Sequence, residues 1–256
     1  IWDKWIQQSI ASVIDPFVGA GTTLLRARER GLSSLGCDMS PLAVLISRVK
    51  TTPVSSGWVR QALRLVLEEA VKDRELPLAI SPRLQRAFTQ VEYVTLWKLR
   101  KAIQQTDGPV REFLLLALIG IARKLSRAVP DGGWFRWVEK PDQSHQVVPS
   151  FYAHAERMIV ELEQCNQSQR VSTTTVLQGD ARTLDPSPDR FDSLITSPPY
   201  PNRHDYSRIF QIELLLLGCG EEEITRFRHG SLRSHVEAKP LRDPLSSDYV
   251  VPDLLR

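Results

Sequence analysis

Cysteine, long apolar runs and a strong charge of one sign are all scarce in this sequence. Three cysteines occur among the 256 residues, far apart and without paired spacing, which argues against a disulfide framework and against a zinc site. The longest apolar run, 113–122, is roughly half the length that a membrane-spanning helix needs. We therefore expect a cytoplasmic protein with no metal and no membrane partner.

The charge balance leaves the nature of the partner open. Lysine and arginine number 33 against 30 aspartate and glutamate residues, a net charge of +3 that neither requires nor excludes a nucleic acid. Hydrophobic residues make up 42% of the chain and charged residues 25%, as in ordinary globular proteins. At this length, one domain with an insertion and two small domains are both compatible with the sequence.

Strand and helix patterns alternate near both ends of the sequence. Apolar strand patterns occur at 12–17, 34–37, 174–178 and 192–196. Helices are predicted directly after the first two strands, over 22–30 and from Ser40-Pro41 onward. An amphipathic helix is predicted at 205–218, and a weaker signal after Gly220 predicts a strand at 249–251. This alternation predicts an α/β fold with a parallel sheet.

Helical periodicity replaces the alternation in the middle of the chain, which predicts a large helical insertion. Apolar residues three and four apart predict helices at 59–72, 91–105, 111–127 and 151–164. Between the last two, prolines and an Asp-Gly-Gly turn surround Trp134, Phe135 and Trp137, so we expect a loop over 129–149. Its aromatic side chains either stack on nucleic-acid bases or pack on the insertion.

Glycines and acidic residues follow the predicted strands. Gly19 and Gly21 lie between a strand and a helix, which is either a tight turn or a nucleotide site built from backbone N–H groups. Asp38 ends the next strand, where a carboxylate can accept hydrogen bonds from both ribose hydroxyls. Asp180 is either a turn residue or an acceptor for an adenine amino group. With Asp15, these carboxylates are expected at one edge of the sheet.

Ser197-Pro-Pro-Tyr200 directly follows a predicted strand. Its two prolines fix the backbone, so that the carbonyls of Ser197 and Pro198 cannot pair in a sheet and must point elsewhere. A base turned out of a duplex can stack on Tyr200 while its amino group donates hydrogen bonds to Ser197 and to the Pro198 carbonyl. Catalysis would then rest on positioning and on charge stabilisation at the amine. A stiff turn or a proline-rich ligand segment is the alternative.

Four segments resemble, in order along the chain, the cofactor and catalytic motifs of the amino-methylating DNA methyltransferases. They are Asp15-Pro-Phe-Val-Gly-Ala-Gly-Thr-Thr23, Gly36-Cys-Asp38 with Ser40-Pro41, Gly179-Asp-Ala-Arg182, and Ser197-Pro-Pro-Tyr200. The residues that follow, 202–208 with Glu213-Leu214 and Leu217-Gly218, are similar to the continuation in one subgroup of bacterial site-specific enzymes. The resemblance implies a Rossmann-like methyltransferase sheet and a role in a restriction-modification system.

The resemblance also implies S-adenosylmethionine as the methyl donor. Asp38 would hold its ribose, Asp180 its adenine, and the helix start at 22–23 its carboxylate, with the other assigned residues near its methionine end. The residues assigned to the cofactor are Asp15, Phe17, Gly19, Gly21, Thr22, Thr23, Asp38 and Asp180.

For the substrate, the resemblance implies double-stranded DNA. The catalytic residues would be Ser197, Pro198, Pro199 and Tyr200, and the nucleic-acid contacts Asn202, Arg203, Tyr206 and Arg208. An ordinary solvated helix start is the alternative interpretation of the second group. Serine at 197, where many relatives have Asp or Asn, favours methylation of cytosine N4 over adenine N6.

The motifs divide the chain into a cofactor-binding half at 1–53, a helical insertion at 54–170 and a catalytic half at 171–256. The insertion either reads DNA or buttresses the cofactor site. A complete enzyme of this kind has a seven-stranded sheet, but only about four strands are predicted before Gly220, so we expect an incomplete sheet. Either the remaining strands are missing from this chain, or a second polypeptide supplies them, or the domain is a degenerate remnant of a complete enzyme.

We therefore expect reduced or absent activity from this chain alone. A catalytically silent S-adenosylmethionine-binding subunit and a methyltransferase acting on RNA or protein are the alternative functions.

Overall fold

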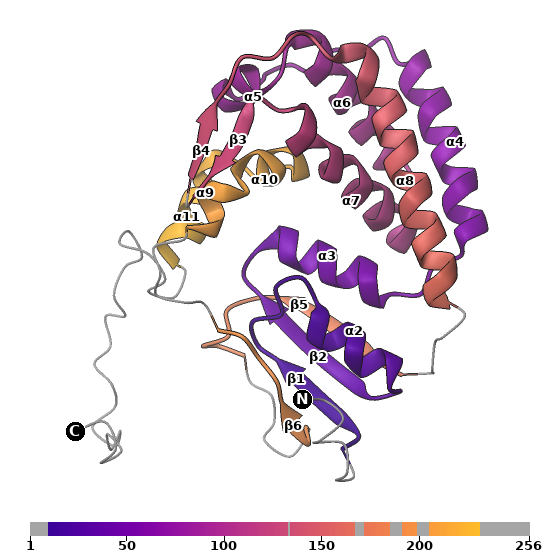
Figure 1. The fold of residues 1–256 in the computed structure, drawn as a ribbon, viewed down its shortest axis with the longest axis vertical. Helices are drawn as coiled ribbons and strands as arrows, with labels where there is room; N and C mark the ends of the chain where they lie inside the picture. Colours follow the sequence, from indigo (N-terminus) through magenta and orange to yellow (C-terminus); the bar gives the residue numbers. More distant parts are fainter. Residues whose placement is uncertain (1–9, 133, 167–171, 185–190, 199–204, 231–256) are drawn as a thin grey trace.

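The computed structural model describes residues 10–132, 134–166, 172–184, 191–198 and 205–230. Over these residues the chain forms a parallel sheet, two helices that pack on it, and a larger group of helices beside it (Figure 1). The strand predicted at 249–251 lies outside the described residues.

The four strands of the main sheet are all parallel and have the order β5-β2-β1-β6. Their bounds are Ser12–Asp15 for β1, Ser33–Asp38 for β2, Thr174–Gln178 for β5 and Ser193–Leu194 for β6. Strands from the two ends of the chain therefore lie side by side, and their carboxyl ends meet at one edge. The predicted Rossmann-like α/β sheet is confirmed.

Helices α2 (Thr22–Glu29) and α3 (Pro41–Thr51) pack on the sheet (Figure 1). The Ser40 side chain caps α3, and Pro41 occupies its first position, where a backbone N–H would have no partner within the helix. The small core between helices and sheet consists of Val18, Leu24, Val44 and Val176.

A buried helix, α7 (Gly108–Leu125), lies at the centre of the larger helical group. The other helices of the group that precede Ser197 are α4 (Ser56–Lys72), α5 (Pro82–Ala87), α6 (Gln90–Ile103) and α8 (Ser144–Asn166). Those that follow Pro198 are α9 (Tyr206–Ile209), α10 (Gln211–Leu217) and α11 (Glu221–Gly230). One hydrophobic core extends from Leu42 of α3 to Ile224 of α11. The helices that follow Pro198 therefore share their core with those of residues 54–170.

The loop predicted over 129–149 is wrong in two respects. Strands β3 (Ala128–Asp131) and β4 (Trp134–Trp137) form an antiparallel hairpin, in which Gly132 has a φ of 60°. Glycine permits this left-handed turn, and the missing N–H of a proline is tolerated in a two-stranded sheet because a strand edge is open. Helix α8 also begins before Pro149 rather than after it.

The burial pattern of α8 explains its early start. Val147, Phe151, Ala155 and Ile159 are each 0% exposed and recur every four residues. This apolar stripe already includes a residue before Pro149, and its burial outweighs the roughly 3 kcal/mol that an internal proline costs a helix. The helix predicted at 205–218 is likewise two helices, which meet at Phe210.

Glu92 on α6 is a fully buried carboxylate that joins three segments of the helical group. It forms a capping box with Thr89 at the start of α6. Arg127 Nη1 and the backbone N–H of Gln143 each donate a hydrogen bond to it at 2.7 Å. Burial opposes ionisation of Glu92, but the hydrogen bonds from Arg127 and from the two amides outweigh burial and hold its pKa below the ordinary value.

Candidate functional site

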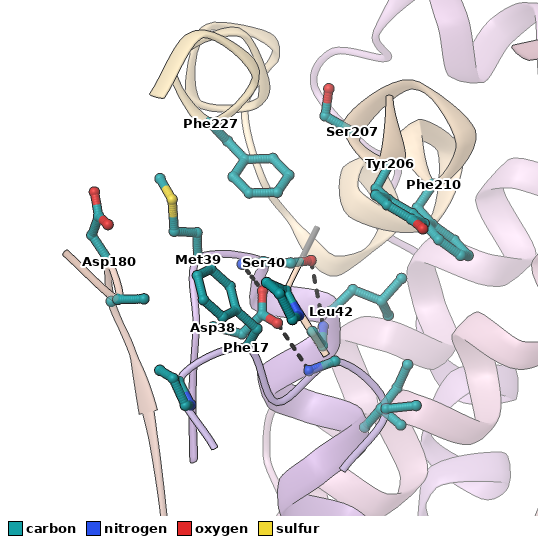
Figure 2. Close-up of a pocket in the computed structure, with 18 of the residues that line it drawn as sticks. Phe17, Asp38, Met39, Ser40, Leu42, Asp180, Tyr206, Ser207, Phe210 and Phe227 are labelled. Carbon is teal, nitrogen blue, oxygen red and sulfur yellow. Dashed lines mark hydrogen bonds between the residues drawn. The ribbon is translucent and has the colours of Figure 1, made fainter. Parts of the chain in front are cut away.

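A cavity of about 420 Å³ opens at the carboxyl edge of the sheet, between the strand ends and helices α9 and α11 (Figure 2). Its volume is within the roughly 300–1,000 Å³ that is typical of small-molecule and cofactor sites. The predicted residues that line it are Phe17, Gly19, Asp38, Asp180, Ser197, Pro198 and Tyr206. Residues assigned to the cofactor and to catalysis therefore meet at one cavity.

The other predicted site residues fall into two groups. Those that are described but do not line the cavity are Asp15, Gly21, Thr22, Thr23 and Arg208. Those outside the described residues are Pro199, Tyr200, Asn202 and Arg203, whose roles stay predictions.

Sequence reasoning missed several side chains of the cavity wall. Met39 and Ser40 directly follow Asp38, and Phe210 lies one helical turn after Tyr206. The position of Met39 and Ser40 directly after Asp38 could have indicated them. The spacing of Phe210 from Tyr206 could have indicated Phe210, because residues four apart share one face of a helix. Phe227 of α11 also lines the cavity, but no local signal connects it to the motifs (Figure 2).

Asp38, the last residue of β2, faces the cavity with both carboxylate oxygens held. The backbone N–H groups of Gly19 and Ser40 each donate to one oxygen at 2.9 Å (Figure 2). Burial raises the pKa of this carboxyl, the two amides lower it in part, and the nearby charge of Asp15 raises it further, so that the net direction is upward. The Asp38 side chain thus fixes the loop that contains Gly19 and Gly21, here called the glycine loop, to the end of β2.

Gly21 allows the glycine loop to approach α3. Its φ is 75°, and a Cβ at this position would lie 2.8 Å from Ser47 Oγ and 2.9 Å from Ser47 Cα. The Ser47 hydroxyl in turn donates to the carbonyl of Gly19 at 3.0 Å. Glycine is therefore required at 21 both for its backbone conformation and for the space that it leaves.

Substitution of Gly21 by alanine is expected to lower the free energy of unfolding by at least about 2 kcal/mol, because it adds backbone strain to overpacking. Urea unfolding followed by circular dichroism measures the change. Gly57→Ala is the matched control, because a Cβ at Gly57 would meet only Ser55 Oγ at 3.7 Å. Equal unfolding midpoints for the two variants would show that the packing at Gly21 is not restrictive.

Asp180, after β5, is paired with Arg182. The Arg182 Nε atom lies 2.9 Å from each carboxylate oxygen of Asp180. This pairing holds the pKa of Asp180 below its ordinary value. Arg182 Nη2 also donates to the carbonyl of Gly230 at 2.8 Å, which joins the end of β5 to the end of α11. A ligand that hydrogen-bonds Asp180 would have to share it with this arginine.

Asp15, the last residue of β1, is 3% exposed. Its Oδ1 atom accepts hydrogen bonds from the backbone N–H of Phe17 at 3.1 Å and from Thr196 Oγ1 at 2.7 Å. Phe17 lines the cavity, and Thr196 directly precedes Ser197. One carboxylate therefore contacts both the glycine loop and the segment that leads from β6 to Ser197.

The start of α9 is held by a buried carboxylate. Asp205 accepts hydrogen bonds from the backbone N–H groups of Ser207 and Arg208. The Nε atoms of Arg208 and Arg228 lie 3.2 and 3.0 Å from its other oxygen. The guanidinium of Arg208, predicted to contact nucleic acid, is therefore engaged with Asp205.

Arg123 of α7 supports the cavity wall that the end of α9 forms. Its Nε atom lies 2.6 Å from Glu213 Oε1, and its Nη2 donates to the carbonyl of Ile209 at 3.2 Å. Its guanidinium lies 4.8 Å from the centre of the Phe210 ring, which lines the cavity. The central helix of residues 54–170 thus contacts the wall of the site directly.

Two features that would point to other functions do not occur among the described residues. No helix there is long and apolar enough to cross a bilayer. The same part of the chain has no cluster of three or more His, Cys, Asp or Glu side chains that could hold a metal ion.

Known DNA methyltransferases are similar to this chain along most of its length. It is 26% identical over 260 residues to the Type II methyltransferase M.AvaI of Nostoc sp., an alignment of 92% of this chain and 54% of the relative. It is 24% identical to M.BsoBI of Geobacillus stearothermophilus, over 93% of this chain and 53% of that protein. It is 22% identical to M.MvaI of Kocuria varians, over 76% of this chain and 47% of that protein.

The chain thus spans about half the length of the curated relatives that it matches. No protein-family model matches it. The similarity supports a relationship with Type II DNA methyltransferases.

Proposed function

We propose that this chain holds the S-adenosylmethionine site and the catalytic turn of a site-specific DNA methyltransferase that modifies an exocyclic base amine. The observation that carries the proposal is that one cavity joins Asp38 and Asp180, at the ends of neighbouring strands, with Ser197 and Pro198. The Type II methyltransferases among its relatives support DNA as the substrate.

The chemistry of Asp38 fits a ribose. Each of its oxygens accepts one hydrogen bond from a backbone N–H, and a carboxylate oxygen has two lone pairs. Both oxygens therefore retain the capacity to accept from one hydroxyl of a cis-diol. Asp180 would accept from the adenine amino group, and the apolar side chains of Met39 and Phe227 lie at the same end of the cavity (Figure 2). S-adenosylmethionine, when bound, supplies an electrophilic methyl group.

Ser197 and Pro198 would orient the target amine. The Ser197 side chain and the Pro198 carbonyl would accept hydrogen bonds from the amine, so that its nitrogen lone pair faces the methyl donor. Ser197 and Pro198 are both exposed, so an extruded base can approach them. Serine at 197 favours cytosine N4 over adenine N6 as the target.

The proposed function is tested by identifying the methylated base. DNA is incubated with the protein and S-adenosylmethionine carrying a deuterated methyl group, digested to nucleosides and analysed by mass spectrometry. We expect slow formation of labelled N4-methylcytosine, and its loss in Ser197→Ala. Labelled N6-methyladenine would correct the base, and label in transfer RNA but not in DNA would support an RNA methyltransferase.

The small number of strands in the described sheet favours one alternative. The described part of the chain has four strands in its main sheet, and the chain matches about half of its relatives. We expect cofactor binding alone to need no second polypeptide, since the cavity is built from this chain's own residues. Binding of S-adenosylmethionine without label in any nucleoside would favour a catalytically silent subunit.

Cofactor affinity is expected to fall on acidification because Asp38 must be ionised to accept both hydroxyl hydrogen bonds. Its pKa is raised, mainly by burial, so protons compete with the ligand at a higher pH than for an ordinary aspartate of pKa about 3.9. Equilibrium dialysis with S-adenosylmethionine from pH 8 downward measures the effect. Asp38→Asn should bind with an intermediate affinity that does not change over this pH range, and an affinity of the unmodified chain that rises on acidification would contradict the assignment.

A further inference from the structure

We infer that Asp15 is a positioning residue, which fixes the catalytic turn relative to the glycine loop from outside the cavity, rather than a residue that contacts the cofactor. This inference rests on the proposed function. It differs from the role that the motif resemblance assigns to Asp15.

The location of Asp15 argues against direct contact with a ligand. Its side chain is 3% exposed, and it is absent from the described residues that line the cavity, although its neighbours Pro16 and Phe17 line it. The donors that reach Oδ1 are an amide and a hydroxyl, both neutral. An amide oxygen can accept the same two hydrogen bonds, so the geometry requires an acceptor at this position rather than a charge.

The second argument comes from the shortness of β6. Its register with β1 covers only two residue pairs, and one further backbone hydrogen bond joins Ile195 to Ile14. Side chains supply further attachments at both ends of the strand. At the start, Asp192 accepts from the backbone N–H groups of Ala11 and Ser12 at 2.8 and 2.9 Å. At the end, Thr196 Oγ1 donates a hydrogen bond to Asp15 Oδ1 at 2.7 Å.

The end of β6 is the part that matters for the proposed chemistry. Thr196 is bonded to Ser197, and Phe17 faces the site where the cofactor would lie. In the proposed function, Phe17 lies beside the methyl donor and Ser197 beside the target amine. The acceptor at Asp15, which both segments share, would therefore set the separation between the methyl group and the amine. Displacement of reacting groups by about 1 Å can slow a reaction by roughly a hundredfold, so a fixed separation has functional value.

Four variants test this role by isothermal titration with S-adenosylmethionine. Asp15→Ala is expected to lower affinity by about tenfold, because Phe17 loses its anchor, whereas Asp15→Asn should stay within about threefold of the unmodified chain. Thr196→Val should also stay within about threefold, since it leaves Phe17 in place. Asp192→Ala is the matched control, because it loosens the other end of β6. Its loss of affinity should be smaller than that of Asp15→Ala.

A second measurement follows the strand itself. Hydrogen exchange of the segment 193–197 is expected to accelerate in Asp15→Ala and in Thr196→Val, and to be restored in Asp15→Asn. Equal losses of affinity in Asp15→Asn and Asp15→Ala would instead indicate a charge contact with the cofactor and overturn the inference. So would an affinity loss in Asp192→Ala as large as that in Asp15→Ala.

The two proposals fail in different ways. If the unmodified chain does not bind S-adenosylmethionine, the proposed function fails, and the exchange measurement still decides whether Asp15 holds the end of β6. If the unmodified chain binds but Asp15→Ala binds equally well, only the inference about Asp15 fails.

Discussion

Replacement of Asp38 by alanine is expected to weaken S-adenosylmethionine binding by about a hundredfold or more. Two ligand hydroxyls would each lose a hydrogen bond to a charged acceptor, and such bonds contribute about 1.5–3 kcal/mol each, with a tenfold change in affinity for every 1.4 kcal/mol. The loss is reinforced because Gly19 and Ser40 also lose their acceptor. Equilibrium dialysis with tritiated cofactor measures it.

Two further variants make the Asp38 result specific. Asp107→Ala removes an exposed carboxylate at the start of α7 that makes no capping hydrogen bond, and it should leave affinity unchanged. Asp38→Asn keeps one acceptor oxygen and is expected to bind with intermediate affinity. An affinity of Asp38→Ala within about threefold of the unmodified chain would rule out the ribose assignment.

Replacement of Glu92 by alanine is expected to lower the free energy of unfolding by about 3–5 kcal/mol, because it leaves Arg127 poorly solvated beside an empty site. The Arg127 side chain is 15% exposed and that of Glu92 is 0% exposed, so water cannot readily replace the lost partner. Urea unfolding at pH 7 measures the loss. The double variant Glu92→Leu with Arg127→Met should be much more stable than Glu92→Ala, because neither charge is then buried alone.

The same ion pair predicts a dependence of stability on pH. The pKa of Glu92 is lower in the folded chain than in the unfolded chain, so its contribution is complete well above about pH 4.3 and is lost as the pH falls through the folded value. Unfolding measured from pH 7 to pH 3 should show a smaller loss on acidification in the double variant. Equal losses in the two proteins would show that Glu92 contributes nothing to the acid sensitivity.

The main sheet was predictable because its signals are local. The strands predicted near 12–17, 34–37 and 174–178 are apolar runs that lead to a glycine or an acidic residue, and the one at 192–196 leads to Ser197-Pro198. These four strands form one parallel sheet with their ends at the cavity. Asp38 and Asp180 could be placed at that edge from topology alone. The spacing of Phe210 from Tyr206 contained the same kind of information.

The remaining features depend on tertiary structure. The hairpin of β3 and β4 contains Pro130 and Gly132, which predict a loop, and α8 continues through Pro149 because its buried stripe outweighs the cost of proline. Phe227 reaches the cavity only because α11 packs on α9. The motif also could not reveal that Asp15 accepts hydrogen bonds from Phe17 and Thr196 outside the cavity.

Isothermal titration of the unmodified 256-residue chain with S-adenosylmethionine tests the central claim most directly. The cavity is built from this chain's own residues, so we predict saturable binding with a stoichiometry near one and competition by S-adenosylhomocysteine. The absence of saturable binding by protein that circular dichroism shows to be folded would contradict the account.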